Sequence, residues 1–171
     1  MAAIVLVGVP GAGKTTVGRL LAKSLKQEFF DSDQVIEAQA GKSVSDIFTQ
    51  DGESAFRSLE HEVIVQLLED NVGVLALGGG ALGNSETRAA VKGATTIWLV
   101  AGLAQAVDRV GMNRNRPLLL GNVRGQLAEL MTAREPLYQE VATIVIDTSK
   151  LIPDEVVSNI LIELEKVGAK S

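Results

Sequence analysis

The amino terminus reads Ile4-Val-Leu-Val-Gly-Val-Pro-Gly-Ala-Gly-Lys-Thr15, an apolar run that passes directly into a glycine-rich loop. Residues Ile4–Val7 are apolar and mostly β-branched, which predicts a strand buried on both faces of a sheet. The stretch Lys14–Leu25 has apolar residues at helical spacing, which predicts a helix that begins where the loop ends. A strand, a tight loop and a helix therefore follow one another, and this order favours an α/β fold.

The loop Gly8–Thr15 has the pattern Gly-x-x-x-x-Gly-Lys-Thr, which is typical of a nucleotide-binding phosphate loop, or P-loop. Its glycines allow several backbone N–H groups to turn toward an anion, and the helix that follows adds its positive end. A glycine-proline turn that fits by chance is the alternative, and the fixed Gly, Lys and Thr positions argue against it. We expect a nucleotide to contact Gly11, Ala12, Gly13, Lys14, Thr15 and Thr16, with Lys14 on its phosphates and the Thr15 hydroxyl on Mg²⁺.

The rest of the chain alternates short apolar runs with helical patterns, as βαβ units around a parallel sheet do. Further strands are predicted at Glu28–Phe30, Val74–Leu77, Thr95–Val100 and Thr143–Ile146. Further helices are predicted at 43–48, 54–69, 84–91, 103–110, 126–133 and 153–166, with Ser43 and Asn84 as caps and a loop at 111–125. We predict one domain over residues 1–171, a three-layer α/β/α fold whose five-stranded parallel sheet binds ligands beyond the carboxyl ends of its strands.

The composition favours a small-molecule substrate. The 171 residues carry a net charge of −5, and the sequence pI of about 4.9 argues against a general nucleic-acid binder, which needs a basic face. No apolar run is long enough to span a membrane, and the amino terminus lacks the basic segment of a secretory signal. With no cysteine, a reducing cytoplasm is permitted. We therefore expect a cytoplasmic protein that binds neither nucleic acid nor membrane, with a composition compatible with a monomer.

A P-loop identifies the nucleotide site but not the reaction, since GTPases, motor ATPases and small-molecule kinases share it. The chain lacks the Asn-Lys-x-Asp pattern with which GTPases read their base. The strand Val74–Leu77 ends in Gly78-Gly-Gly80, so it offers no Walker B carboxylate for Mg²⁺. The acidic residues for this chemistry must come from another part of the chain.

Asp31 and Asp33 are the available acidic pair. Two residues apart in an extended segment, their side chains would point to the same side. One carboxylate would then serve a hydrated metal ion, and the other would receive a substrate hydroxyl. A turn or a helix cap is the alternative, because Asp is common at both. The missing Walker B acid favours the functional interpretation.

Taken together, the separated motifs resemble those of shikimate kinases, and the resemblance covers essentially the whole chain. Such enzymes phosphorylate the 3-hydroxyl of shikimate with ATP and Mg²⁺, a step toward chorismate and the aromatic amino acids. The resemblance implies a substrate-binding segment at about 32–60 and a mobile lid at about 111–125. The matching motifs are Gly8–Thr15, Asp31–Asp33, Phe56-Arg57 within Asp51–Glu60, Gly78–Gly80, Arg116–Leu119 and Arg134-x-Pro-Leu-Tyr138.

The resemblance also implies how the substrate is bound. Arg57 and Arg134 match two arginines that bind the shikimate carboxylate, for which a planar guanidinium is well suited. Asp33 matches the carboxylate that binds a hydroxyl and is placed to take its proton. Glu60 would brace Arg57 from one turn away. The turn Gly78, Gly79 and Gly80 would supply a backbone N–H contact, with Gly79 as the matching residue.

For the nucleotide, the resemblance implies three further residues. Arg116 in the lid would act with Lys14 and Asp33 in catalysis by stabilising the transferring phosphate. Arg109 would stack on one face of adenine and Pro153 would contact the other. Asp31 would support Mg²⁺ together with Thr15. Two questions stay open: whether Arg114 shares the role of Arg116, and whether Lys150 replaces the polar contact that is absent at Leu151.

Two conspicuous side chains have structural interpretations. His61 on the long predicted helix matches no role in the family and is interpreted as a surface or partly buried residue. Trp98 in a predicted strand is interpreted as packing. Two rival functions stay open: a different small-molecule kinase, such as a gluconate kinase-like or nucleotide kinase, and a regulatory protein that binds ATP without transferring phosphate.

Overall fold

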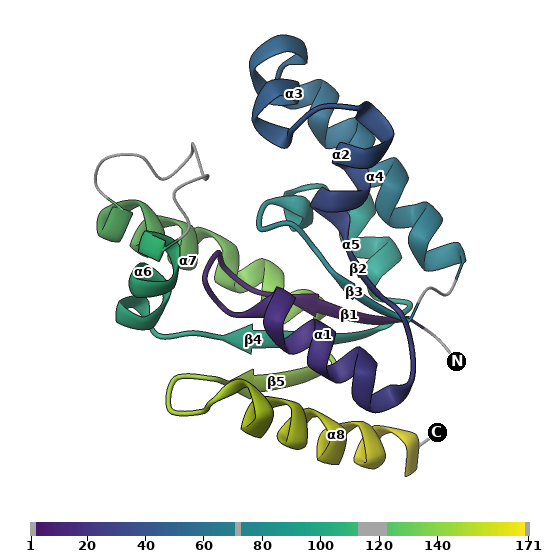
Figure 1. Cartoon of the computed structure of the whole chain (residues 1–171), viewed down its shortest axis with the longest axis vertical. Helices are drawn as coiled ribbons and strands as arrows, with labels where there is room; N and C mark the ends of the chain where they lie inside the picture. Colours follow the sequence, from purple (N-terminus) through teal and green to yellow (C-terminus); the bar gives the residue numbers. More distant parts are fainter. Residues whose placement is uncertain (1–2, 71–72, 113–122, 170–171) are drawn as a thin grey trace.

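The computed structural model describes residues 3–70, 73–112 and 123–169. Its centre is the five-stranded parallel sheet that the sequence predicts, and the strands lie in the order β2-β3-β1-β4-β5 (Figure 1). Along the chain the elements are β1 (Ile4–Val7), α1 (Lys14–Leu25), β2 (Phe29–Asp31), α2 (Ser32–Ala40), α3 (Val44–Asp51), α4 (Glu53–Glu69), β3 (Val74–Ala76), η1 (Ala81–Gly83), α5 (Ser85–Val91), β4 (Thr95–Val100), α6 (Leu103–Met112), α7 (Val123–Val141), β5 (Ile144–Asp147) and α8 (Pro153–Ala169).

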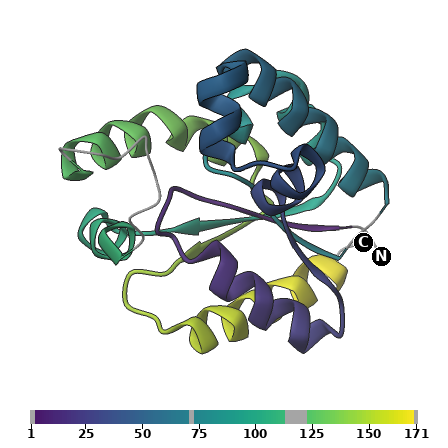
Figure 2. The ribbon, with the colours of Figure 1, turned by 45° about the horizontal axis from the view of Figure 1, so that its top comes forward.

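The helices cover both faces of the sheet, which confirms the predicted three layers. Helices α1 and α8 pack together on one face, and α4, α5 and α7 lie on the other (Figure 2). Helices α2 and α3 extend from α4 beyond the carboxyl ends of β2 and β3 (Figure 1). The segment predicted to bind substrate therefore projects over the edge of the sheet where the P-loop lies.

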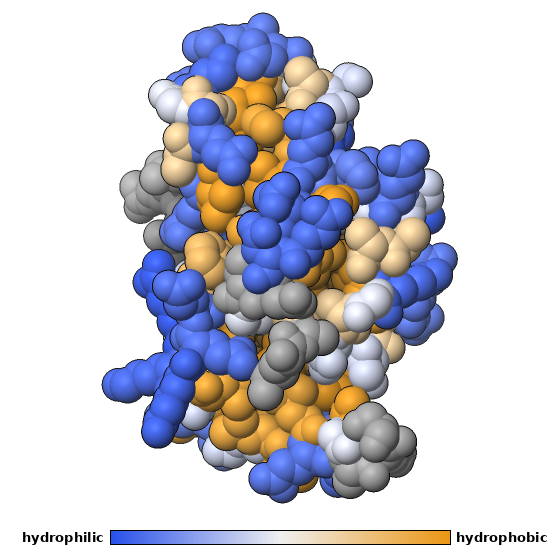
Figure 3. Space-filling view, turned by 90° about the vertical axis from the view of Figure 1, so that its right-hand side faces the viewer, coloured by the Kyte–Doolittle hydropathy of each residue, from blue (hydrophilic) through white to orange (hydrophobic). Residues whose placement is uncertain are grey.

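Apolar residues of the inner strands form the core. Strand β1 is buried along its whole length, and Leu75, Ile97 and Leu99 on its neighbours have no exposed surface. On the face shown in Figure 3, hydrophilic residues cover much of the upper half, and apolar residues reach the surface in a strip between them and again near the lower end. No helix within the described ranges has the length and apolar character needed to cross a membrane.

Two parts of the secondary structure differ from the sequence expectation. Residues 32–40 form helix α2, where no helix was predicted, because the Asp31 side chain caps it by accepting a hydrogen bond from the Asp33 N–H at 2.9 Å. Helix α7 does not end at Ala133 but continues through Pro136 to Val141. Tyr138, which is 2 % exposed, packs on Trp98 with ring centroids 5.6 Å apart, and this contact holds the last turns of α7 on the sheet.

The predicted loop at 111–125 is also shorter than expected. Helix α6 continues to Met112 and α7 already begins at Val123. The remaining residues, 113–122, lie outside the described ranges. They contain Arg114 and Arg116, so the predictions for these two arginines stay untested.

The buried sheet predicts a large difference between two isoleucines. Ile97 on β4 is fully buried, whereas Ile162 on α8 is 52 % exposed. We expect Ile97→Ala to lower the free energy of unfolding by about 2–5 kcal/mol, because it leaves a cavity in the core. The matched control Ile162→Ala should change it by only about 0.5 kcal/mol. Urea unfolding followed by circular dichroism measures both, and equal losses would contradict the assigned core.

Candidate functional site

The P-loop has a backbone that needs glycine at defined positions. Gly11 and Gly13 adopt φ values of 85° and 92°, in the left-handed region that other residues avoid. A Cβ atom at Gly11 would lie 2.7 Å from the Ala106 carbonyl oxygen on α6. Gly13 also forms the amino-terminal cap of α1, so the loop wraps tightly against the start of this helix.

Lys14 lies across the loop that precedes it. Its Nζ atom donates hydrogen bonds to the carbonyl oxygens of Gly8 at 2.6 Å and of Val9 at 3.1 Å. The ammonium group is therefore held at the loop, next to the positive amino-terminal end of α1. This arrangement concentrates positive charge where the P-loop pattern predicts phosphate groups.

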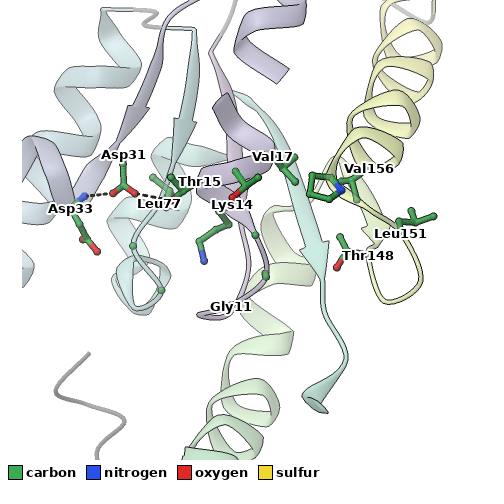
Figure 4. A pocket seen from close by; sticks show the side chains of 16 residues that line it. Gly11, Lys14, Thr15, Val17, Asp31, Asp33, Leu77, Thr148, Leu151 and Val156 are labelled. Atoms are coloured by element: carbon green, nitrogen blue, oxygen red, sulfur yellow. Dashed lines mark hydrogen bonds between the residues drawn. The ribbon is translucent and has the colours of Figure 1, made fainter. Parts of the chain in front are cut away.

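The acidic pair connects to the P-loop helix. Asp31 Oδ2 accepts a hydrogen bond from Thr15 Oγ1 at 3.3 Å, and Asp31 Oδ1 accepts one from the Asp33 N–H (Figure 4). The expectation of an extended segment was wrong, because Asp33 lies in the first turn of α2 and Asp31 is its cap. Both side chains nevertheless line one cavity, since the start of the helix sits at the end of β2.

That cavity, of about 360 Å³, runs along the carboxyl ends of the strands. The P-loop and the acidic pair form one part, and the apolar side chains of Val17, Leu151 and Val156 lie toward the other (Figure 4). Its complete lining is Gly11, Ala12, Gly13, Lys14, Thr15, Thr16, Val17, Asp31, Asp33, Leu77, Gly78, Gly79, Thr148, Leu151, Pro153 and Val156. All six P-loop residues expected to contact a nucleotide are present, together with Pro153.

The lining also contains residues that the sequence reasoning missed. Thr148 follows β5 directly, and its hydroxyl donates to the Val100 carbonyl oxygen at 2.9 Å. Its position at the end of a strand was the signal that could have identified it. Leu151 lines the cavity and Lys150 does not. The side chain of Arg109 lies outside the described part of α6.

Three consecutive glycines form the turn after β3, and each lies against a different charged side chain. A Cβ atom at Gly78 would lie 2.6 Å from Asp33 Oδ1, and one at Gly79 would lie 2.8 Å from Arg134 Nη1. A Cβ atom at Gly80 would overlap the guanidinium of Arg57. The turn therefore brings together the three side chains predicted to bind substrate, which come from α2, α4 and α7.

Arg57 is held by an acidic and an aromatic partner. Its Nη1 atom lies 2.8 Å from Glu60 Oε1, which confirms the expected bracing contact. Its guanidinium carbon also lies 5.1 Å from the ring centroid of Phe56 and 5.7 Å from that of Phe48. Contacts of this kind fix the plane of a guanidinium, which matters for binding a carboxylate through two parallel hydrogen bonds.

Glu60 is 2 % exposed, and the charged groups around the glycine turn affect the pKa of its carboxyl. Burial raises the pKa of its carboxyl, and the Arg57 guanidinium opposes this effect. The charges of Asp33 and Arg134 also act on Glu60, in opposite directions. Glu60, Arg57, Arg134 and Gly80 are not part of the cavity lining, but they adjoin it through Gly78 and Gly79.

Ser32 is a second residue that the sequence reasoning missed. It has no exposed surface, and its Oγ atom accepts a hydrogen bond from the Gly78 N–H at 2.9 Å. Its position between Asp31 and Asp33, just after a predicted strand, was the available signal in the sequence. The bond connects the end of β2 to the glycine turn.

His61 and Trp98 take the structural positions expected of them. His61 Nδ1 lies 2.8 Å from Thr87 Oγ1, and its Nε2 lies 3.6 Å from a Glu86 carboxylate oxygen. These contacts join α4 to α5, and neither His61 nor Trp98 lines the cavity.

The raised pKa of Glu60 predicts a dependence of stability on pH. Since the folded protein holds this proton more tightly than the unfolded chain, whose carboxyl has its ordinary value of 4.5, Glu60 stabilises the fold at acid pH. This contribution is lost as the pH rises above 4.5 through the raised pKa. We expect Glu60→Gln to gain stability relative to the parent protein over that range. Urea unfolding at several pH values measures the difference, and a difference that falls with pH would contradict the assignment.

The family model "Shikimate kinase" matches residues 10–165. A shikimate kinase of Thermobifida fusca is 50 % identical over 164 residues, which cover 96 % of this chain and 95 % of the relative. The solved structure of the Acinetobacter baumannii shikimate kinase in complex with shikimate has a TM-score of 0.93 at 38 % identity and covers 97 % of this chain and 94 % of that one.

The solved structure of a gluconokinase from Sinorhizobium meliloti has a TM-score of 0.64 at 18 % identity, and the match covers 99 % of this chain and 94 % of the gluconokinase chain. This likeness is one of fold alone. The likeness to the shikimate kinases extends over nearly the whole length of both partners. The chain belongs to the shikimate kinase family of ATP-dependent kinases.

Proposed function

We propose that the chain transfers the γ-phosphoryl group of ATP to the 3-hydroxyl of shikimate and releases ADP and shikimate 3-phosphate. The observation that carries this proposal is the convergence of Asp33, Arg57 and Arg134 on one glycine turn beside a P-loop. Shikimate has a carboxylate and three hydroxyl groups. Two arginines suit the carboxylate, and one carboxylate beside the phosphate site suits a hydroxyl.

The nucleotide would be held by the cavity lining. Backbone N–H groups between Gly11 and Thr16 would bind the phosphates, with Lys14 as their mobile positive charge. The apolar surface of Val17, Pro153 and Val156 would receive the base. Stacking by Arg109 stays a prediction from the family resemblance.

Thr15 and Asp31 are suited to a magnesium ion. Their side-chain oxygens lie 3.3 Å apart at the P-loop, and Mg²⁺ prefers hard oxygen ligands with several retained waters. When bound, the ion would neutralise charge on the β- and γ-phosphates. The hydrogen bond between the two side chains keeps both oxygens directed toward the same place.

Asp33 would orient the acceptor hydroxyl and accept its proton as the bond to phosphorus forms. The Asp33 carboxylate lies against Gly78. The Asp33 backbone N–H donates a hydrogen bond to the Asp31 carboxylate and so holds that neighbouring side chain in place. Arg57 and Arg134 would bind the substrate carboxylate from the other side of the turn. The acceptor would then face the γ-phosphate in a fixed orientation, which is the main source of catalysis in phosphoryl transfer.

The lid at about 111–125, with Arg116 as a catalytic residue that stabilises the transferring phosphate, belongs to this proposal as a prediction. Closure of such a segment would exclude water that competes with the hydroxyl. The substrate-binding segment at about 32–60, a cytoplasmic location, a monomeric state and the absence of nucleic-acid or membrane partners are proposed in the same sense.

A coupled assay of ADP release tests the proposal directly. We expect rapid release with ATP, Mg²⁺ and shikimate, and only slow release with ATP and Mg²⁺ alone. Gluconate, other hydroxy acids and nucleoside monophosphates serve as competing acceptors in the same assay. Faster ADP release with one of these acceptors would show that the protein is a different small-molecule kinase. Binding of shikimate without ADP release would favour the alternative of a regulatory protein that binds ATP without transferring phosphate.

Arg57 provides a prediction about substrate affinity. Arg57→Ala removes a charge-assisted contact to the carboxylate, so we expect the KM for shikimate to rise roughly 10- to 100-fold. Arg57→Lys should recover only part of this loss, because an ammonium cannot form two parallel hydrogen bonds. The KM for ATP should stay nearly constant. Unchanged shikimate affinity in Arg57→Ala would show that the carboxylate binds at another place.

The glycine turn offers a matched pair of variants. A methyl group at Gly80 would displace the Arg57 side chain, whereas a Cβ at Gly83 meets nothing within 4 Å. Gly80→Ala should raise the KM for shikimate by about tenfold, as expected for the loss of one good polar contact, while the thermal unfolding temperature changes little. Gly83→Ala should behave like the parent protein. Equal kinetics for both variants would contradict the importance of the turn.

A further inference from the structure

Ser32 lies between the two acidic residues of the site in the sequence and, unlike them, does not line the cavity. It has no exposed surface, and its hydroxyl oxygen accepts the hydrogen bond from the Gly78 N–H at 2.9 Å. The two residues are 46 positions apart in the chain. The bond therefore joins the β2–α2 junction to the turn that follows β3.

Both partners of this bond adjoin the proposed substrate site. Asp33 follows Ser32 directly, and its carboxylate lies against the Cα of Gly78. The next two glycines of the turn lie against Arg134 and Arg57. A shift of Gly78 away from β2 would thus change the spacing between Asp33 and the two arginines.

The bond uses one backbone N–H group of the glycine turn, that of Gly78, so this group is not available to a ligand. Gly78 directs its N–H to Ser32, while the Gly78 and Gly80 carbonyl oxygens accept from Ala81 and Gly83 at 3.1 and 3.2 Å. Within the described residues, no hydrogen bond is formed by the N–H groups of Gly79 and Gly80. The turn is therefore anchored at its first residue, and its later donors are left for another partner.

From these contacts we infer that Ser32 is a positioning residue for the acceptor half of the site. Its hydroxyl fixes the glycine turn relative to Asp33. The distance between Asp33, which would bind the hydroxyl of shikimate, and the arginines, which would bind its carboxylate, is thereby kept constant. The inference rests on the proposed function, because it concerns the site assigned to shikimate. The inference predicts an effect on shikimate binding and not on ATP binding. The reason is that Asp31, and not Ser32, links the β2–α2 junction to the P-loop helix.

The decisive variants change the hydroxyl of Ser32 and leave Asp31 and Asp33 in place. We expect Ser32→Ala to raise the KM for shikimate about tenfold, the factor for one hydrogen bond in a buried network, with the KM for ATP within about twofold of the parent value. Ser32→Thr retains the hydroxyl and should restore most of the affinity. Ser32→Cys replaces the hydroxyl with a somewhat larger thiol that is only a weak acceptor, and it should resemble Ser32→Ala. It provides the same test if the alanine variant fails to fold.

A buried hydroxyl far from the site serves as the control. Thr96 is fully buried near the start of β4, and its Oγ1 donates to the Val91 carbonyl oxygen at 3.2 Å. Thr96→Val should lower the unfolding temperature and leave the KM for shikimate unchanged. If Thr96→Val raises that KM as Ser32→Ala does, the effect is a general loss of packing and the inference is wrong.

Two further outcomes would also overturn it. Parent-like shikimate affinity in both Ser32→Ala and Ser32→Cys would show that the hydrogen bond does not position the turn. A loss of affinity in Ser32→Thr equal to that in Ser32→Ala would show that the hydroxyl is not the cause. Arg57→Ala, measured in parallel by calorimetry with shikimate, separates the two proposals. If it binds normally, the proposed acceptor site itself is wrong, whereas impaired binding together with a normal Ser32→Ala contradicts only the role of Ser32.

Discussion

The absence of side chains at Gly78, Gly79 and Gly80 is the constraint on which the site depends. Each missing Cβ leaves space for one charged group, so Asp33, Arg134 and Arg57 approach the same short turn from three different helices. The proposed binding of a small hydroxy acid rests on this arrangement.

The parallel sheet determines where this turn lies. Strand β3 lies between β2 and β1, so the glycine turn emerges between the acidic pair and the P-loop. Pro10 of the P-loop is also a close neighbour of Gly79. The proposed nucleotide and acceptor parts of the site therefore adjoin at this turn, which would suit a direct transfer between two bound substrates.

Burial of Glu60 shows how the protein maintains a charged cluster next to its core. The carboxylate loses water contacts, and the Arg57 guanidinium at 2.8 Å compensates for part of that loss. The aromatic rings of Phe48 and Phe56 also lie near the guanidinium. Arg57 is thus held in place before any ligand binds, and less conformational entropy has to be lost on binding.

The sequence by itself determined the P-loop, the number and positions of the strands and the kinds of side chain that carry the chemistry, because these follow from local pattern and residue type. It did not predict α2, since the cap at Asp31 looked like an extended acidic pair, nor the length of α7, since the packing of Tyr138 on Trp98 stabilises the helix beyond Pro136. Only the tertiary structure decided which glycine faces which charged group and that Ser32 binds Gly78. These contacts join residues far apart in the chain, and their geometry is set by the order of the strands, which no local pattern contains.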